Sequence, residues 1–246
     1  MSIRPFVAIT SLMLAAPTLD AACFTRSGTQ RARLVELYTS EGCSSCPPAD
    51  AWLRTLRADA TLVPLAFHVD YWDSLGWRDP YASPRFTLRQ REVAARSRRG
   101  VVYTPEVALD GREWRGWRGA RISPATAPPS LSLALELERG ATLDVRVTAA
   151  APAFDPAWRA YLALIEDGLV SEVRAGENDG RTLAHDHVVR AFAGPLALDA
   201  ARASWPVPPG LVRERASVVA FVQHPGTGEV LQVVRTALAA CEAEAR

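Results

Sequence analysis

The sequence has 246 residues, of which 48% are hydrophobic and 22% are charged, and its formal net charge is +1. This length favours two domains, each large enough to bury a core, and the balanced charge argues against a nucleic-acid binder or a carrier of polyanions. Lysine is absent, which excludes mechanisms that depend on a lysine Schiff base or a P-loop lysine.

Residues 1–22 have the plan of a secretory signal: Arg4, an apolar run over residues 6–14, and a stretch of small residues before Cys23. The apolar run is too short to span a bilayer. We therefore expect export to the periplasm or the cell exterior, with no stable membrane insertion after removal of the signal. A lipid on Cys23 is disfavoured, because Asp20 stands where lipoprotein signals carry an apolar residue.

Between residues 34 and 121, short apolar runs alternate with helix-like stretches, a pattern typical of α/β architectures. The first three predicted elements are a strand, an amphipathic helix and a strand, over residues 34–38, 50–62 and 62–69. Residues 85–97 predict a second helix. Asp110-Gly111, between two strand-like runs, predicts a hairpin.

Residues 123–130 are small and proline-rich, and a linker between two domains is predicted there. Beyond it, residues 131–137 and 143–147 alternate between apolar and polar, which predicts a hairpin with one solvated face. Further strands are predicted over residues 160–165, 169–173, 187–192, 217–223 and 230–236. Short strands separated by turns favour a mainly antiparallel β-sandwich-like domain over residues 131–246, with a C-terminal helix.

Cys43 and Cys46 form a C-x-x-C motif between the strand that ends at Tyr38 and the following helix. A thiol at a helix N-terminus lies near unpaired N–H groups and the positive end of the helix dipole, which lower its pKa. Two intervening residues allow the second thiol to resolve a mixed disulfide formed at the first. We predict that Cys43 attacks and that Cys46 resolves.

Two other roles for this motif are less favoured. A zinc site needs two further ligands, and the sequence has no second C-x-x-C and no H-x-x-x-H. We therefore predict neither a bound metal nor a cofactor. A purely structural disulfide between Cys43 and Cys46 would close a short loop, which constrains the unfolded chain only weakly.

Thr104 and Pro105 supply a second indication. The run over residues 99–111 resembles the segment of thioredoxin-like domains in which a cis-proline lies against the active-site cysteines and exposes backbone for substrate pairing. The resemblance covers residues 33–121. It implies an α/β thioredoxin-like domain over residues 23–122, a cis Thr104–Pro105 bond, and a catalytic role for Pro105 in shaping the substrate cleft.

Three segments extend the resemblance to nearly the whole mature chain: residues 35–50, 68–73 and 180–190. They are similar to secreted bacterial thioredoxin-like proteins grouped as a family of unknown function, which implies a fold and a location but no substrate. This chain departs from ordinary thioredoxins at Gly42, where Trp is usual. Pro47 and Pro48 remove two N–H donors from the first helical turn, so we expect the helix to begin later and to act less on Cys43.

Residues 71–84 form an apparent insertion with four aromatic side chains, Tyr71, Trp72, Trp77 and Tyr81. They form either a peptide-contacting rim near the cysteines or a satellite core beneath a loop. On the first interpretation, Tyr71, Trp72 and Thr104 bind substrate.

Cys23 and Cys241 lie near the two ends of the mature chain. Four cysteines allow three pairings, and a bond between the C-x-x-C cysteines leaves these two as partners. We favour a structural disulfide that closes a very long loop. The alternative is that both thiols stay free or join other molecules.

His185 and His187 are two residues apart and would share one face of a strand. They form either half of a copper or zinc site, with His224 or Asp179, or hydrogen bonds between a loop and the sheet, which we favour. His68 is expected to be a buried, hydrogen-bonded histidine. For Asp70 we consider a proton relay to Cys46.

The sequence thus predicts an exported thiol–disulfide oxidoreductase that acts on protein thiols or disulfides. One alternative is a non-catalytic binding module with an idle disulfide. Another is a copper-handling protein with Cys43 and Cys46 as soft ligands. Neither a nucleic-acid partner nor an oligomeric state is predicted.

Overall fold

The computed structural model describes residues 23–97 and 100–243. The predicted signal segment, residues 1–22, lies outside the described residues. Within the described ranges the chain forms fourteen β-strands, three α-helices and several short 3-10 turns. No helix in these ranges is long and apolar enough to cross a membrane.

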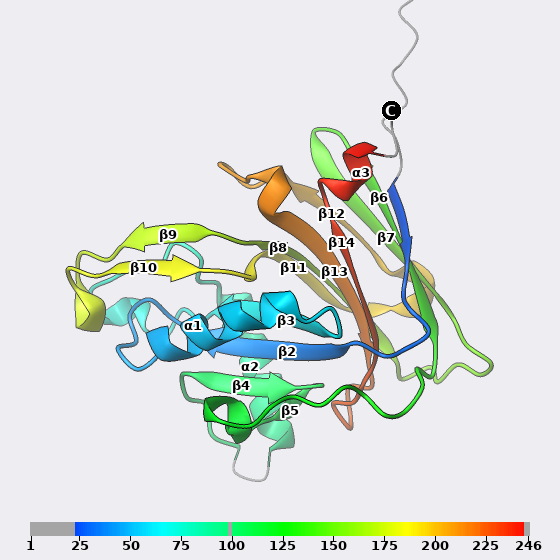
Figure 1. Ribbon diagram of the computed structural model, residues 1–246, viewed down its shortest axis with the longest axis horizontal. Coiled ribbons are helices and arrows are strands. Elements are labelled where there is room, and N and C mark those ends of the chain that lie inside the picture. The colour runs from blue at the N-terminus through cyan, green and yellow to red at the C-terminus, as the bar shows by residue number, and fades with distance from the viewer. Residues whose placement is uncertain (1–22, 98–99, 244–246) are drawn as a thin grey trace, which may run out of the picture.

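The largest sheet has eight strands in the order β14-β13-β8-β11-β3-β2-β4-β5 (Figure 1). Four of them come from the first half of the chain: β2 (Arg33–Thr39), β3 (Leu62–His68), β4 (Glu106–Leu109) and β5 (Arg112–Glu113). The other four come from the second half: β8 (Arg159–Glu166), β11 (Val188–Ala197), β13 (Ala216–Gln223) and β14 (Val230–Ala237). The halves join where β3 pairs in parallel with β11, at Ala66 and Val188.

This sheet corrects the predicted fold class, an α/β thioredoxin-like domain followed by a β-sandwich-like domain. Strands dominate the described chain, and only α1 (Pro47–Thr55) and α2 (Pro84–Arg96) are α-helices longer than α3 (Ala240–Ala243). The strands of the first half have no sheet of their own, because β11 occupies the edge of β3. Pairing satisfies backbone N–H and C=O groups that an open edge would leave exposed.

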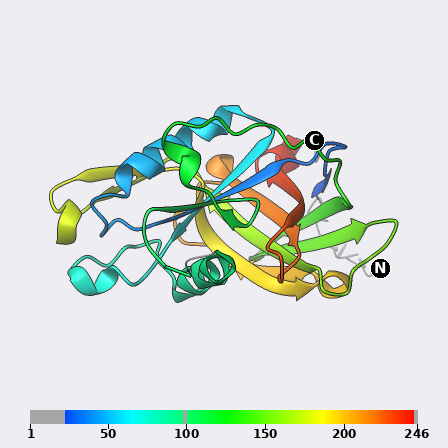
Figure 2. The same cartoon turned by 90° about the horizontal axis from the view of Figure 1, so that it is seen from below.

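The two faces of β2 pack against different helices. Val35 and Leu37 belong to the core beneath α1, whereas Leu34 and Tyr38 belong to the core beneath α2. Burial on both faces explains why this strand is a continuous apolar run. Figure 2 shows α1 and α2 on opposite sides of the sheet.

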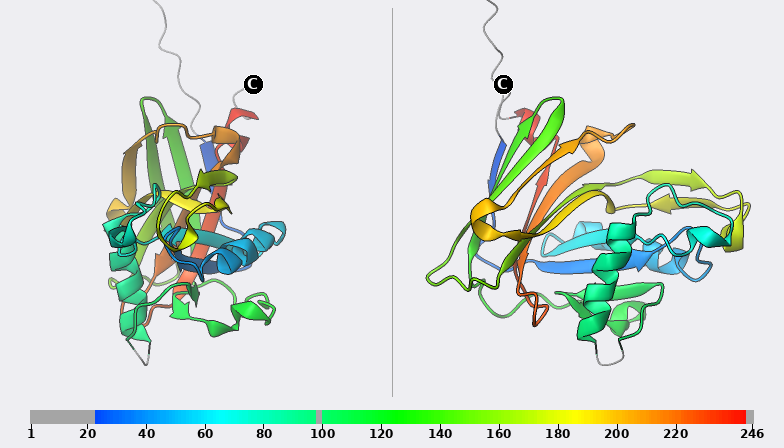
Figure 3. Two further views of the ribbon diagram at one scale, coloured as in Figure 1. Left: turned by 90° about the vertical axis from the view of Figure 1, so that its left-hand side faces the viewer. Right: turned by 180° about the vertical axis from the view of Figure 1, so that it is seen from behind.

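A four-stranded antiparallel sheet covers part of the large one. Its order is β1 (Cys23–Arg26), β6 (Ser132–Arg139), β7 (Thr142–Ala150) and β12 (Arg202–Pro206). The predicted hairpin β6–β7 is confirmed, and its alternation directs Leu133, Leu135 and Leu137 into a shared core with Leu162 and Leu164 of β8. A separate hairpin, β9 (Leu169–Glu172) and β10 (Thr182–His185), lies at the other end of the molecule (Figure 3).

The predicted hairpin at Asp110-Gly111 is also confirmed, between β4 and β5. Both residues have left-handed backbone, with φ of 49° and 78°. A Cβ at Gly111 would collide with the backbone carbonyl of Gly228, so the turn requires glycine for both its conformation and its close approach.

The two ends of the described chain are joined. Cys23, at the start of β1, forms a disulfide with Cys241 in α3. Both cysteines are buried at the edge of the core between the two large sheets. The predicted pairing of the terminal cysteines is therefore confirmed.

Candidate functional site

Cys43 and Cys46 form the second disulfide, in the loop between β2 and α1. Cys46 is the N-cap residue of α1, and its carbonyl oxygen accepts hydrogen bonds from the N–H groups of Ala49 (2.8 Å) and Asp50 (3.2 Å). The helix begins at Pro47, three residues earlier than predicted. Prolines fit this first turn because its N–H groups have no helical partner in any case.

Both cysteines are buried, with 0% of their surface exposed, although Ser44 and Ser45 between them are exposed. The turn between β9 and β10 is hydrogen-bonded to the loop. Asn178 donates hydrogen bonds from Nδ2 to the carbonyl oxygens of Glu41 (2.8 Å) and Cys43 (3.0 Å). The N–H of Ser44 donates to the Glu177 carboxylate at 2.9 Å. This turn, called the cover below (residues 176–178), therefore holds the backbone on both sides of Cys43.

Trp72 connects the cysteine loop to the proline segment. Its Nε1 donates to Oγ1 of Thr104 at 2.8 Å, and the Thr104–Pro105 bond is cis, as expected. A Cβ at Gly42 would lie 3.1 Å from Cβ of Trp72, which explains why no larger residue stands before the first cysteine. Pro105 is buried, whereas Tyr71 is exposed beside Trp72.

Beneath the cysteine loop lies a cluster of buried ionisable side chains, called the polar cluster below: Glu41, Asp50, His68, Asp79 and His185. His68 Nδ1 lies 2.7 Å from Oδ2 of Asp79, and His185 Nε2 lies 3.2 Å from Oε1 of Glu41. The two imidazole centroids are 4.9 Å apart. Asp50 Oδ2 accepts a hydrogen bond from Thr39 at 3.0 Å.

Burial and pairing act against each other in this cluster. Burial raises the pKa of Asp50 above its ordinary value. Burial also opposes the charged form of His68, but the carboxylates of Asp79, Asp50 and Glu41 together outweigh it and raise the pKa of His68. The same pair lowers the pKa of Asp79 despite its burial. The two opposite shifts have one shared cause, the 2.7 Å contact between His68 Nδ1 and Asp79 Oδ2.

Two aromatic side chains of the segment over residues 71–84 contact the polar cluster. Trp77 donates from Nε1 to Oε2 of Glu41 at 2.7 Å, and the ring of Tyr81 packs on those of His68 (5.4 Å) and His185 (6.0 Å). These two side chains enclose the polar cluster. Tyr71 is exposed, and Trp72 packs against the core beneath α2.

His185 and His187 do not share a strand face. β10 ends at His185, and His187 has left-handed backbone with φ of 60° and lies 2.9 Å from Asp167. In the described chain, the one close group of three or more potential metal ligands is Asp50, His68 and His185. The predicted half-site with His187, His224 or Asp179 is therefore not assembled.

Sequence analysis missed most of the polar cluster. Its members come from the ends of β2, β3 and β10, from α1 and from the loop before α2, so no local spacing joins them. The available signal was that polar residues follow the buried apolar runs of β2 and β3 directly. Asp70, considered as a relay to Cys46, instead accepts a hydrogen bond from Thr87 of α2.

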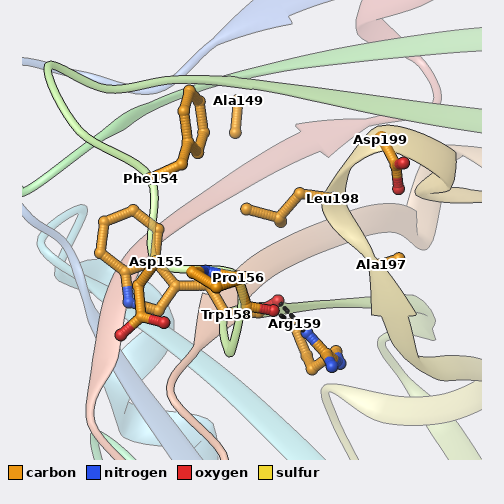
Figure 4. Close-up of a pocket in the computed structure, with 9 residues that line it drawn as sticks. All are labelled: Ala149, Phe154, Asp155, Pro156, Trp158, Arg159, Ala197, Leu198 and Asp199. Carbon is orange, nitrogen blue, oxygen red and sulfur yellow. Dashed lines mark hydrogen bonds between the residues drawn. The ribbon is translucent and has the colours of Figure 1, made fainter.

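The molecule also has an apolar pocket of about 490 Å³, lined by Phe154, Trp158 and Leu198 among others (Figure 4). Its lining residues come from the end of β7, the start of β8, the end of β11 and the segments beside them. The pocket contains none of the predicted site residues.

Comparisons with known proteins give a family and a fold. A family model described as "Protein of unknown function (DUF1223)" matches residues 34–223. No curated protein matches the chain.

Two solved structures are similar to the chain. One is a structural-genomics target from Agrobacterium tumefaciens, with a TM-score of 0.58, 24% identity, and coverage of 84% of this chain and 95% of that chain. The other is HBP35 of Porphyromonas gingivalis, with a TM-score of 0.62, 14% identity, and coverage of 87% and 77%. Identities this low show a shared fold alone.

Proposed function

We propose a function from the site itself, because the chain belongs to the DUF1223 family, whose description assigns no activity. The protein is an exported thiol–disulfide oxidoreductase in which Cys43 and Cys46 are the redox pair. The observation that carries this proposal is the Cys43–Cys46 disulfide at the N-terminus of α1, with Trp72 linking its loop to the cis-proline segment.

The reaction transfers two electrons by thiol–disulfide exchange. A substrate thiolate attacks the sulfur of Cys43, which forms a mixed disulfide and releases Cys46 as a thiolate. A second substrate thiolate attacks the substrate sulfur of the mixed disulfide and releases Cys43. The substrate leaves as a disulfide and the protein as a dithiol, and the reverse sequence reduces a substrate disulfide. The dipole of α1 stabilises the thiolates formed at its N-terminus.

Because both sulfurs are buried and the cover holds their loop, we infer that the cover must open before a partner reaches them. Three hydrogen bonds join it to backbone groups of the cysteine loop, two from Asn178 and one to Glu177. Each contributes about 0.5–1.5 kcal/mol net, so breaking the three costs about 1.5–4.5 kcal/mol. This cost slows exchange without preventing it. Export is consistent with the Cys23–Cys241 disulfide as well, since disulfides persist in oxidising compartments.

The complete burial of both sulfurs is the observation that favours the alternative, a non-catalytic module with an idle disulfide. Equilibrium titration with reduced and oxidised glutathione separates the two functions, with alkylation and peptide mapping to follow each cysteine pair. We expect the Cys43–Cys46 pair to exchange with glutathione while the Cys23–Cys241 pair stays oxidised. A Cys43–Cys46 bond as resistant as the terminal one would overturn the proposal.

The Cys46→Ser variant is expected to accumulate a mixed disulfide between Cys43 and its substrate in a periplasmic extract, because the resolving thiol is missing. Non-reducing electrophoresis detects the adduct, and Cys43→Ser is the matched control. Equal adducts from both variants, or none from either, would contradict the assigned roles.

The cover provides a separate prediction. Replacing Asn178 with alanine removes two hydrogen bonds to the cysteine loop, worth about 2 kcal/mol, so reduction of the Cys43–Cys46 disulfide by dithiothreitol should become about 10- to 30-fold faster. Timed alkylation measures the rate. Glu172→Gln, an exposed position on the same hairpin, is the control. An unchanged rate in the Asn178 variant would mean that the cover does not limit access.

A further inference from the structure

Two histidines of the polar cluster each leave one ring nitrogen without a partner. His68 Nδ1 faces Asp79 and His185 Nε2 faces Glu41, but within the described residues His68 Nε2 and His185 Nδ1 have no hydrogen-bond partner. The two side chains are only 0% and 2% exposed. Buried polar atoms are nearly always satisfied, so two such atoms in one cluster need an explanation.

A third ligand lies beside them. The potential ligand atoms of Asp50, His68 and His185 all lie within 4.8 Å of one another. Ligand atoms on one tetrahedral zinc ion are about 3.4 Å apart, because Zn–N and Zn–O distances are about 2.0–2.2 Å. Side-chain rotations that shorten the longest of these separations by about 1.4 Å would bring the three atoms onto one ion.

The surroundings of the two histidines fit metal binding. Imidazole ligands of metals donate their other ring N–H to a carboxylate or a carbonyl, which fixes the tautomer and the ring orientation. Here the carboxylates of Asp79 and Glu41 are the acceptors for His68 and His185. Asp79 in turn accepts hydrogen bonds from the N–H groups of Glu41 (2.9 Å) and Tyr81 (2.9 Å), and Trp77 holds Glu41. The carboxylates of Asp79 and Glu41 are therefore held in place by residues other than Asp50, His68 and His185.

The charge of the cluster points the same way. Three carboxylates, those of Glu41, Asp50 and Asp79, are buried together with two imidazoles. A divalent cation between the unpaired nitrogens and Asp50 offsets part of this negative charge and at the same time gives both nitrogens a partner. A proton on His68 Nε2 or His185 Nδ1 would not replace the cation, because the new N–H would have no acceptor among the described residues.

We propose that Asp50, His68 and His185 bind one Zn²⁺ ion beneath the Cys43–Cys46 loop. Two nitrogens and one oxygen form a set that zinc accepts in proteins, with the fourth position left for water or another ligand. The site uses neither cysteine sulfur. It is therefore independent of the proposed redox function, and either can fail without the other.

The test is zinc binding by the intact, oxidised protein after treatment with a chelator. Calorimetric titration with Zn²⁺ at neutral pH should give one equivalent per chain, with metal content checked by mass spectrometry. In Asp50→Asn and His185→Gln the affinity should fall by at least about 100-fold, since loss of an outer carboxylate alone costs about 10- to 100-fold. His187→Gln, which changes a buried histidine outside the set, should keep the affinity of the parent.

Cobalt substitution keeps the test informative if a variant unfolds, which circular dichroism would detect. Co²⁺ in the parent should give the visible absorption of a tetrahedral site with nitrogen and oxygen ligands, without a thiolate charge-transfer band. A double Cys43→Ser and Cys46→Ser variant should bind Zn²⁺ as the parent does. No stoichiometric binding to the parent, or equal binding by parent, Asp50→Asn and His185→Gln, would overturn the proposal, as would loss of binding in the folded double serine variant.

Discussion

Replacing Arg89 with methionine is expected to lower the free energy of unfolding by about 3–5 kcal/mol, the cost of leaving a buried charge without its partner. Arg89 is 2% exposed, and its Nε and Nη2 donate to the two carboxylate oxygens of Glu36 at 2.9 and 3.2 Å. Its Nη1 donates to Oε1 of Gln223 at 2.8 Å. Methionine fills much of the volume, so the loss comes mainly from the uncompensated Glu36 carboxylate.

A double variant separates the two contributions. If the uncompensated charge is the cause, adding Glu36→Gln to Arg89→Met should restore a large part of the lost stability. Urea unfolding followed by circular dichroism measures each free energy. Arg91→Met, an exposed position on the same helix, is the control and should change stability by less than about 0.5 kcal/mol. Equal destabilisation by the Arg89 and Arg91 variants would contradict this account.

Arg89 also explains part of the fold. It extends from α2 to Glu36 of β2 and to Gln223 of β13, and its guanidinium lies 4.8 Å from the ring of Tyr161 and 5.5 Å from that of Phe221. One side chain from the first half of the chain thus contacts two strands of the second half. Its loss should destabilise both halves together, as a single unfolding transition would show.

Local sequence signals predicted individual elements well. The runs over residues 34–38 and 62–69 became β2 and β3, and the helix over residues 85–97 became α2. These elements depend on periodicity, which neighbouring residues determine. The fold class was wrong because it depends on which strands pair. The pairing of β3 with β11 joins segments more than a hundred residues apart, and hydrophobic alternation carries no information about that choice.

The candidate site was predictable to the same extent. Counting four cysteines was enough to predict both disulfides, because a short C-x-x-C pair leaves one other combination. The polar cluster was not predictable, since its members meet only through the sheet. His185 and His187 give an example. Regular strand alternation would place both side chains on one face, but the left-handed backbone at His187 interrupts the alternation.

The terminal disulfide gives the second large expected effect. Cys23 and Cys241 are separated by 218 residues and Cys43 and Cys46 by 3. Loop-closure entropy of the unfolded chain then contributes about 5 kcal/mol for the first bond and about 2 kcal/mol for the second. Replacing both terminal cysteines with alanine should therefore cost about 3 kcal/mol more than the same change at the C-x-x-C pair.

The comparison is matched because all four cysteines are buried and each double variant removes two buried sulfurs, so the packing losses are similar and largely cancel. Calorimetry should show a melting temperature about 6–12 °C lower for Cys23→Ala with Cys241→Ala than for Cys43→Ala with Cys46→Ala. The reverse order would mean that the short disulfide supports the native state directly, through the packing of the loop above the polar cluster. A mainly structural disulfide would behave in that way, whereas a redox centre must tolerate both states of its sulfurs.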